Sequence, residues 1–358
     1  IIDNIYGFSF IQSNTHSPYF IKPLNSSNTF TSCNLQPMDR CSLLQSRLNL
    51  SSSSLSTPPE FCPRRKALKL STSALPSSMD QTTQAAKAQK VFSSVPHLLP
   101  PHTDAINNLV FKVYEHLGPQ LQPSSAAVPP DAERYQSQDG LSHGSLFINR
   151  GTAASHVDFV LSSCLYLSLP NNSLKVTNLH GYLKATTDAP HFLFELCQMS
   201  PSQFIFFLDV NPRKDLVLNS DYRKVFYEDG GLESCRKRFY EEVPEATPYV
   251  SSSIYFRSVS SPTAILALIK CEEGEALRAE EIVRDRVSTV AEEVIKIWIE
   301  RCALSERIVC EEEMNVLRKR DGVVKRNAVE TDLGSTLPMI FGAKGEVVLD
   351  VIRAAHKI

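Results

Sequence analysis

The stretch HFLFELCQMSPSQFIFFLDV, residues 191–210, decides the fold class of this sequence. It contains two apolar segments, 191–199 and 203–210, which are joined by the short polar link Ser-Pro-Ser. Each segment is shorter than an ordinary helix and is bounded by residues that favour turns, which is typical of strands. Because so short a link cannot carry a crossover connection, the two strands are expected to pair in antiparallel fashion.

Three segments before this stretch show the same pattern. They are SLFI from Ser145, VDFVLSSCLYLSL from Val157 and LKVTNLHGYL from Leu174, and Pro, Asn, Gly or Ser residues separate them. A further strand is expected at 264–270, after a helical stretch around 222–227. Consecutive strands with short links predict an antiparallel meander.

Helices are expected both before and after these strands. The first helix is indicated by apolar residues at helical spacing between a capping Thr-Asp pair and a Gly-Pro stop, namely Ile106, Leu109, Val110, Val113 and Leu117. Heptad-like spacing of valines predicts a long helix over 283–298, and a final helix is expected over 348–355. The fold class is therefore α/β, an α/β/α sandwich with a central antiparallel sheet flanked by helices. We assign residues 90–358 to this single domain.

Composition excludes several classes of function. The 358 residues carry 37 Lys and Arg against 39 Asp and Glu, a net charge of −2, so net charge gives no positive field for holding nucleic acid. The longest apolar runs, FIFFL from Phe204 and ILALI from Ile265, are far shorter than the roughly 20 residues of a membrane span. We therefore expect neither a nucleic-acid partner nor a membrane span.

Metal and cofactor motifs are also missing from the sequence. The nine cysteines form no CxxC pair, the nine histidines show no HExxH spacing, and the thirteen glycines contain no GxGxxG and no phosphate loop. Such a cysteine pattern is typical of reduced thiols in a compartment outside the secretory route. If the protein is a redox enzyme, its sequence brings no common cofactor motif.

The N-terminal part differs in composition from the rest. Residues 38–80 are rich in serine, arginine and lysine, poor in acidic residues, and lack the compact apolar core of a secretory signal. We interpret them as a disordered chloroplast transit peptide that begins at Met38, with a plain disordered tail as the alternative. Residues 1–37 are then expected to be disordered, translated upstream sequence.

Glu195 is the first candidate for chemistry. Period-2 alternation in HFLFELCQ places Phe192, Phe194 and Leu196 on one face of a strand. Glu195 lies on the other face in an apolar neighbourhood, where a carboxyl group tends to keep its proton and can act as a general acid. The alternative is a sheet face open to solvent or an ion pair with the next strand.

Three other features are weaker candidates. Asp332, in VETDLGSTLP between two expected helices, could equally be a turn or cap residue. Basic pairs at Arg213, Arg223 and Arg236 alternate with aromatic residues and could dock an acidic electron carrier, or could form a solvated helix face. His180 could be a ligand or base, or a satisfied histidine at a strand end.

Several unusual strings occur in an order that resembles one known family. The strings are APHFLFELCQ, FLDVNPRKDLVLNSDY, PYVSSSIYFRSVSSPTA, WIERC and VETDLGSTLPMIFG. Over about residues 90–358 they resemble red chlorophyll catabolite reductase of plant chloroplasts. The resemblance implies the fold of ferredoxin-dependent bilin reductases, with an open-chain tetrapyrrole bound between the sheet and C-terminal helices. It also implies a location in the chloroplast stroma.

The resemblance implies an activity and a set of residues. The activity is reduction of red chlorophyll catabolite to the primary fluorescent catabolite, with electrons from reduced ferredoxin and no bound flavin or metal. The catalytic acids of the family fall on Glu195 and Asp332. Substrate contacts fall on the segment Pro248, Tyr249, Val250 and Ser251 and on Val259. Further implied partners are pheophorbide a oxygenase and a second copy of the chain in a homodimer.

Two alternatives stay open beside this interpretation. The protein could reduce a different linear bilin on the same fold. It could instead bind a phototoxic tetrapyrrole without turning it over.

Overall fold

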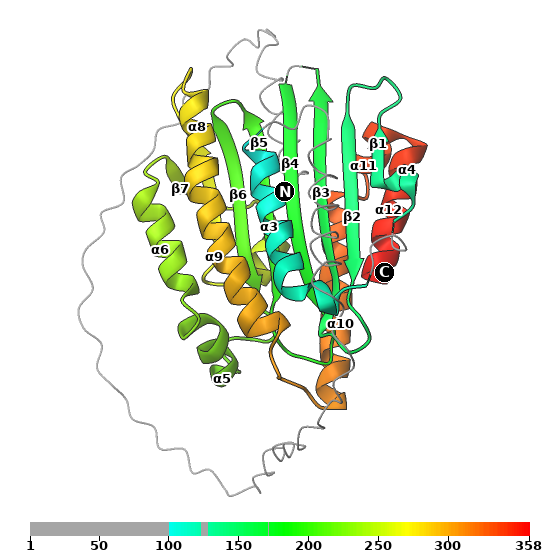
Figure 1. The fold of residues 1–358 in the computed structure, drawn as a ribbon, viewed down its shortest axis with the longest axis vertical. Coiled ribbons are helices and arrows are strands. Elements are labelled where there is room, and N and C mark those ends of the chain that lie inside the picture. The colour runs from blue at the N-terminus through cyan, green and yellow to red at the C-terminus, as the bar shows by residue number, and fades with distance from the viewer. Residues whose placement is uncertain (1–99, 123–127, 171) are drawn as a thin grey trace, which may run out of the picture. The chain divides into compact units, whose positions relative to one another are not determined.

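A computed structural model describes residues 100–122, 128–170 and 172–358 (Figure 1). The expected transit peptide and upstream segment lie outside these residues. The described chain contains an eight-stranded sheet in the order β1-β2-β3-β4-β5-β6-β8-β7. The strands are β1 Arg134–Gln136, β2 His143–Arg150, β3 Val157–Leu169, β4 Asn172–Leu183, β5 His191–Ser200, β6 Gln203–Asn211, β7 Ala246–Pro248 and β8 Ile265–Lys270.

The predicted meander is confirmed. Every neighbouring pair of strands is antiparallel, and β2 to β6 follow one another in both sequence and sheet. The strand expected at 264–270 is β8, which pairs with β6. The edge strands β1 and β7 were not predicted, because three residues are too few to show a period of two.

One face of the sheet is covered by helices from both ends of the meander. They are α3 His102–Leu117, α6 Leu232–Glu242, and a continuous helical stretch made of α8 Ala276–Ile282, η4 Val283–Val287, α9 Ser288–Trp298 and η5 Ile299–Ala303. Buried residues of α3, α6 and α9 pack with Phe192, Phe194 and Leu196 of β5 in one hydrophobic core. This confirms the alternation predicted for HFLFELCQ.

The other face is covered by C-terminal helices, as Figure 1 shows for α10 and α12. These C-terminal helices are α10 Glu311–Asp332, α11 Thr336–Phe341 and α12 Ala343–His356. The remaining short helices of the described chain are η1 Gly118–Gln120, α4 Pro130–Glu133, α5 Ser220–Arg223, η3 Lys224–Glu228 and α7 Ile254–Val259. Residues of the C-terminal helices form a second core with the opposite side of the strands. The described chain is thus the expected α/β/α sandwich. None of its described helices is long and apolar enough to cross a bilayer.

The two faces of the sheet are buried to different degrees. Side chains toward α3 and α9 are almost completely buried along β4, β5, β6 and β8. On the face toward the C-terminal helices, half-buried residues gather at the centre of the sheet, namely Asn178, His180, Leu193, Glu195, Leu266 and Leu268. We call this set the half-open face. Helix α10 lies on this side of the sheet and leaves these residues half-buried.

Trp298 fixes α9 to the fully buried face of the sheet, the face opposite the half-open face. Its indole nitrogen donates a hydrogen bond to the Pro190 carbonyl at 3.0 Å, and its ring lies 5.6 Å from the ring of Phe192. The ring rests on Gly181 of β4, where a Cβ atom would stand only 2.5 Å from the ring edge. Glycine is required at this position because the indole fills the space of a side chain.

We expect Gly181→Ala to destabilise the fold by about 1–3 kcal/mol, because a fully buried indole cannot move aside without repacking. The control is Gly322→Ala in the middle of α10, where nothing lies within 4 Å of the added Cβ. That change should stabilise the protein by about 0.5–1 kcal/mol through helix propensity. Urea unfolding of both variants measures the difference, and equal stabilities would contradict the packing argument.

Candidate active site

Glu195 lies in the middle of the half-open face. Its register partners are Asn178 on β4 and Phe207 on β6, and one of its carboxyl oxygens is shielded from solvent. Asn178 in turn accepts a hydrogen bond from Ser163 on β3 at 3.0 Å. A polar row therefore runs across β3, β4 and β5, and the carboxyl group of Glu195 is its last member.

Apolar rings and chains surround this carboxyl group. Leu193 and Cys197 share its strand face, and the ring of Phe207 packs against that of Phe256 from α7 at 4.9 Å. Tyr249 also packs against this core, and its backbone N–H donates to the Leu266 carbonyl at 2.8 Å. A flat apolar floor with one central acid can support a planar ligand and give it a proton.

The expected substrate segment 248–251 is only partly directed to this face. Pro248 ends β7 opposite Ala267, and Tyr249 packs against the core that contains Cys197 and Phe207. Val250 is 73% exposed, whereas Ser251 is buried and its carbonyl accepts a hydrogen bond from Arg257. Among these four residues, Tyr249 is the one that the structure brings closest to the apolar floor.

Val259 is the last residue of α7 and is half-buried. The block RSVSSPTA is helical up to Val259 and forms a turn after it. Asn211 of β6 donates a hydrogen bond to the Val259 carbonyl at 2.6 Å. Val259 is therefore not a fully buried core residue.

Asp209 holds the turn that follows Val259. The Ser261 backbone N–H donates to Asp209 Oδ2 at 2.9 Å, and the Ser261 hydroxyl donates to Oδ1. Asp209 lies opposite Leu193, on the same sheet face as Glu195. Burial raises the pKa of Asp209 to about 6, although the hydrogen bonds from Ser261 favour the charged form. Two of the unusual sequence strings, FLDVN and RSVSSPTA, are therefore joined by the hydrogen bonds from Ser261 to Asp209.

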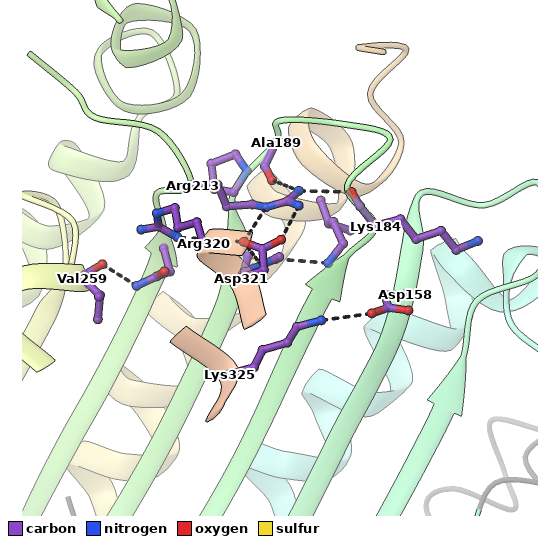
Figure 2. Close-up of polar contacts among 12 residues, drawn as sticks. Asp158, Lys184, Ala189, Arg213, Val259, Arg320, Asp321 and Lys325 are labelled. Carbon is purple, nitrogen blue, oxygen red and sulfur yellow. Dashed lines mark hydrogen bonds and ion pairs between the residues drawn. The ribbon is translucent and has the colours of Figure 1, made fainter. Parts of the chain in front are cut away.

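Asp332 is the last residue of α10, so it lies at a helix end as the sequence suggested. Helix α10 is held on the sheet by buried charges. Arg213, which follows β6, contacts both carboxyl oxygens of Asp321, at 3.3 and 2.5 Å, and also donates to the carbonyls of Thr187 and Ala189 (Figure 2). Burial raises the pKa of Asp321, but His191 and Arg213 outweigh it, and the net pKa lies well below the ordinary value.

A second ion pair lies one turn further along α10. Lys325 binds Asp158 of β3 at 3.0 Å (Figure 2), and Lys357 binds the other oxygen of Asp158 at 2.9 Å. The Lys325 ammonium group also lies 5.2 Å from the ring centre of Phe159 and 5.1 Å from that of Tyr182. Together the two ion pairs fix both the height and the direction of α10 above the sheet.

Histidines near α10 are neutral. The Leu183 N–H donates to His191 Nδ1 at 3.1 Å, so the ring proton is on Nε2, which lies 3.4 Å from Asp321. Burial lowers the pKa of His191 to about 4, and the positive charge of Arg213 acts in the same direction. His180 lies inside β4 and not at a strand end, and burial together with His356 lowers its pKa to about 3.

Comparison with known proteins identifies the family. A family model described as red chlorophyll catabolite reductase matches residues 101–357. The chloroplastic red chlorophyll catabolite reductase 1 of Oryza sativa subsp. japonica is 37% identical over 298 residues, which are 81% of this chain and 90% of the rice protein. This chain belongs to the red chlorophyll catabolite reductase family. The resemblance inferred from the sequence is thereby confirmed.

Two further members of the red chlorophyll catabolite reductase family show the same degree of similarity. The chloroplastic protein of Arabidopsis thaliana is 38% identical over 258 residues, or 71% of this chain and 79% of its own length. The protein of Hordeum vulgare is 38% identical over 200 residues, or 55% of this chain and 97% of its own length.

A solved structure confirms the fold class. The crystal structure of phytochromobilin synthase from tomato in complex with biliverdin superposes with a TM-score of 0.53 at 16% identity. The match covers 71% of this chain and 82% of the tomato chain. At this identity the likeness shows a shared fold, that of the ferredoxin-dependent bilin reductases.

The basic cluster predicted for docking is not a single surface in this reductase-family chain. Arg213 is 1% exposed and belongs to the anchor of α10, so its assignment to a docking patch was wrong. Arg223 pairs with Glu228 at 2.7 Å, and Arg236 pairs with Glu233 at 2.8 Å. Their positive charges are largely neutralised by neighbouring acids. Within the described ranges, no group of His, Cys, Asp or Glu side chains is arranged to hold a metal ion.

Sequence reasoning missed Asp209 and Asp321. The signal for Asp209 was present, because the alternation of QFIFFLDV places it on the face of Ile205 and Phe207. Asp321 stands in a polar run, RKRDG, and nothing local distinguishes it from an exposed acid. Its partner Arg213 lies 108 positions away.

Asp209 makes stability depend on pH in a defined window. Its carboxyl pKa is about 6 in the folded state against 3.8 for an ordinary aspartate, so the folded state binds more protons between these values and loses stability as pH rises through them. We expect wild type to lose about 3 kcal/mol relative to Asp209→Asn between about pH 4 and pH 7. Urea unfolding across this range measures it, with exposed Asp104→Asn as the control. Parallel profiles for wild type and Asp209→Asn would disprove the assignment.

Proposed function

We propose that this protein reduces red chlorophyll catabolite, an open-chain tetrapyrrole, to the primary fluorescent chlorophyll catabolite, with electrons from reduced ferredoxin. Membership of the red chlorophyll catabolite reductase family over residues 101–357 carries this proposal. The half-open face with Glu195 at its centre supports it, because a planar pigment needs an apolar floor and a nearby acid. The names of the rice and Arabidopsis relatives support a chloroplast location, and we propose the stroma.

The reaction adds two electrons and two protons to the pigment. Two reduced ferredoxins each give one electron and leave oxidised. The chain itself supplies protons, holds the pigment in one orientation and excludes water from it. In this mechanism the carboxyl group of Glu195 gives one proton from the sheet side, and Asp332 gives the other from the end of α10.

The position of each acid suits its role. Glu195 is held by strand pairing on both sides, so its distance from a pigment on the apolar floor varies little. Asp332 belongs to a helix whose place is set by the Arg213–Asp321 and Lys325–Asp158 pairs. Donors on two separate elements can protonate different atoms of one pigment.

Other parts of the proposal concern partners. We propose that the protein holds no flavin and no metal, and that it acts as a homodimer with pheophorbide a oxygenase as a further partner. An anaerobic assay with reduced ferredoxin tests the central claim. Turnover of red chlorophyll catabolite supports it, turnover only of biliverdin-type bilins favours a different bilin reductase, and binding without turnover favours a sequestering protein.

Replacing either acid by its amide should separate binding from chemistry. We expect Glu195→Gln and Asp332→Asn to keep pigment binding and to lose reduction on the order of 10²-fold or more, because an amide has the same shape and no acidic proton. Absorption titration measures binding, and anaerobic product formation measures turnover. Glu346→Gln on the exposed side of α12 is the control and should keep full activity. Near-normal turnover in both site variants would remove these acids from the mechanism.

Val259→Phe should change the stereochemistry of the product. The added ring would fill space at the end of α7 and shift the seating of the pigment, so that a proton reaches the other face. Chromatography of the fluorescent product is expected to show a changed ratio of its two epimers. An active variant with an unchanged ratio would place Val259 outside the binding site. Loss of folding is not expected, because Val259 is only half-buried.

A further inference from the structure

Arg320 on α10 carries a charged nitrogen whose position calls for an anion. Its Nη1 atom is shielded from solvent, and among the described residues this atom has no hydrogen-bond partner. The side chain as a whole is 29% exposed. A shielded cationic donor without an acceptor is costly, and the cost is removed when an acceptor binds.

The carboxylate of Asp321 does not accept a hydrogen bond from Arg320 Nη1. Asp321 Oδ1 lies 4.0 Å from Arg320 Nη1, beyond the length of a hydrogen bond. Both carboxyl oxygens of Asp321 already bind Arg213, and Oδ1 also lies 3.4 Å from His191. In Figure 2 the Arg320 side chain points from α10 toward the side on which Val259 is drawn.

Tyr255 of α7 provides a second donor beside this guanidinium group. Its hydroxyl oxygen is shielded, and the Asn327 side chain lies beside it. Burial raises the pKa of Tyr255, and the nearby Asn327 amide and Arg320 charge act in the opposite direction. Arg320 and Asn327 are seven residues apart on α10, so both lie on the side of the helix that meets α7.

This group of donors lies at the edge of the half-open face. Phe256, the neighbour of Tyr255, packs on Phe207, and Phe207 is the register partner of Glu195. A ligand that covers this floor would therefore extend toward α7. Linear tetrapyrroles have a flat apolar body with carboxylate side chains on its rim, and a guanidinium fork matches a carboxylate in shape and charge.

We propose that Arg320, assisted by Tyr255, binds a carboxylate side chain of the linear tetrapyrrole and so sets its orientation over Glu195. This inference rests on the proposed function. Arg320 acts in binding alone and takes no part in proton transfer.

The test compares red chlorophyll catabolite with its propionate methyl ester, which keeps the pigment body and loses the charge. Absorption titration gives the affinity of each form under anaerobic conditions. Wild type is expected to bind the free acid about tenfold to a hundredfold more tightly than the ester, the value of a charge-assisted hydrogen bond. Arg320→Gln should lose this preference by weakening the acid only, and Tyr255→Phe should reduce it by a smaller factor.

The matched control is Lys319→Gln, which removes one positive charge from the adjacent exposed position of the same helix. It should keep the full preference for the free acid. Equal binding of acid and ester by wild type would overturn the inference even if Arg320→Gln failed to fold. So would an Arg320→Gln variant that weakens both forms equally, because that result indicates a structural role. If wild type neither binds nor reduces either form, the proposed function itself fails.

Discussion

The buried pair of Arg213 and Asp321 is the interaction on which the site depends. A guanidinium group with 1% exposure is stable here because it meets a carboxylate and backbone carbonyls of the loop before β5. Removal of one partner would leave the other charge buried without compensation, which typically costs about 3–5 kcal/mol. The pair joins the end of β6, the loop before β5 and α10, and these segments frame the half-open face.

The same interaction explains what sequence reasoning could and could not find. The strands from β2 to β6 were predictable because apolar residues recur along them, and these residues are the ones that the sheet buries. Helix α10 has 22 residues, yet the sequence shows no apolar stripe along it. Its buried stripe is Leu317, Asp321, Lys325 and Val329, so half of the residues on this stripe are charged. The partners of those charges, on β3 and after β6, are too distant in sequence to be recognised.

The charged stripe also accounts for the open centre of the sheet. A helix with a continuous apolar stripe would settle into the pleats of the strands and bury Glu195 completely. Ion pairs at the ends of β3 and β6 hold α10 by its middle, and the sheet between them stays only half covered. The alternation pattern was enough to place Glu195 on the strand face opposite Phe192 and Phe194. It was not enough to show whether that face is half-covered or open to solvent, because both give the same sequence pattern.

Three elements meet at the half-open face, and each is fixed by a different kind of bond. Strand pairing sets Glu195 on β5, ion pairs set α10, and the hydrogen bonds of Asp209 and Asn211 set Val259 and the turn after α7. Because these supports are independent, a change in one can move its element and leave the others in place. A pigment that spans all three would thus meet an acid on the floor, a cation at the rim and a side chain that limits its tilt. Orientation in such a site comes from the backbone framework that holds these three elements.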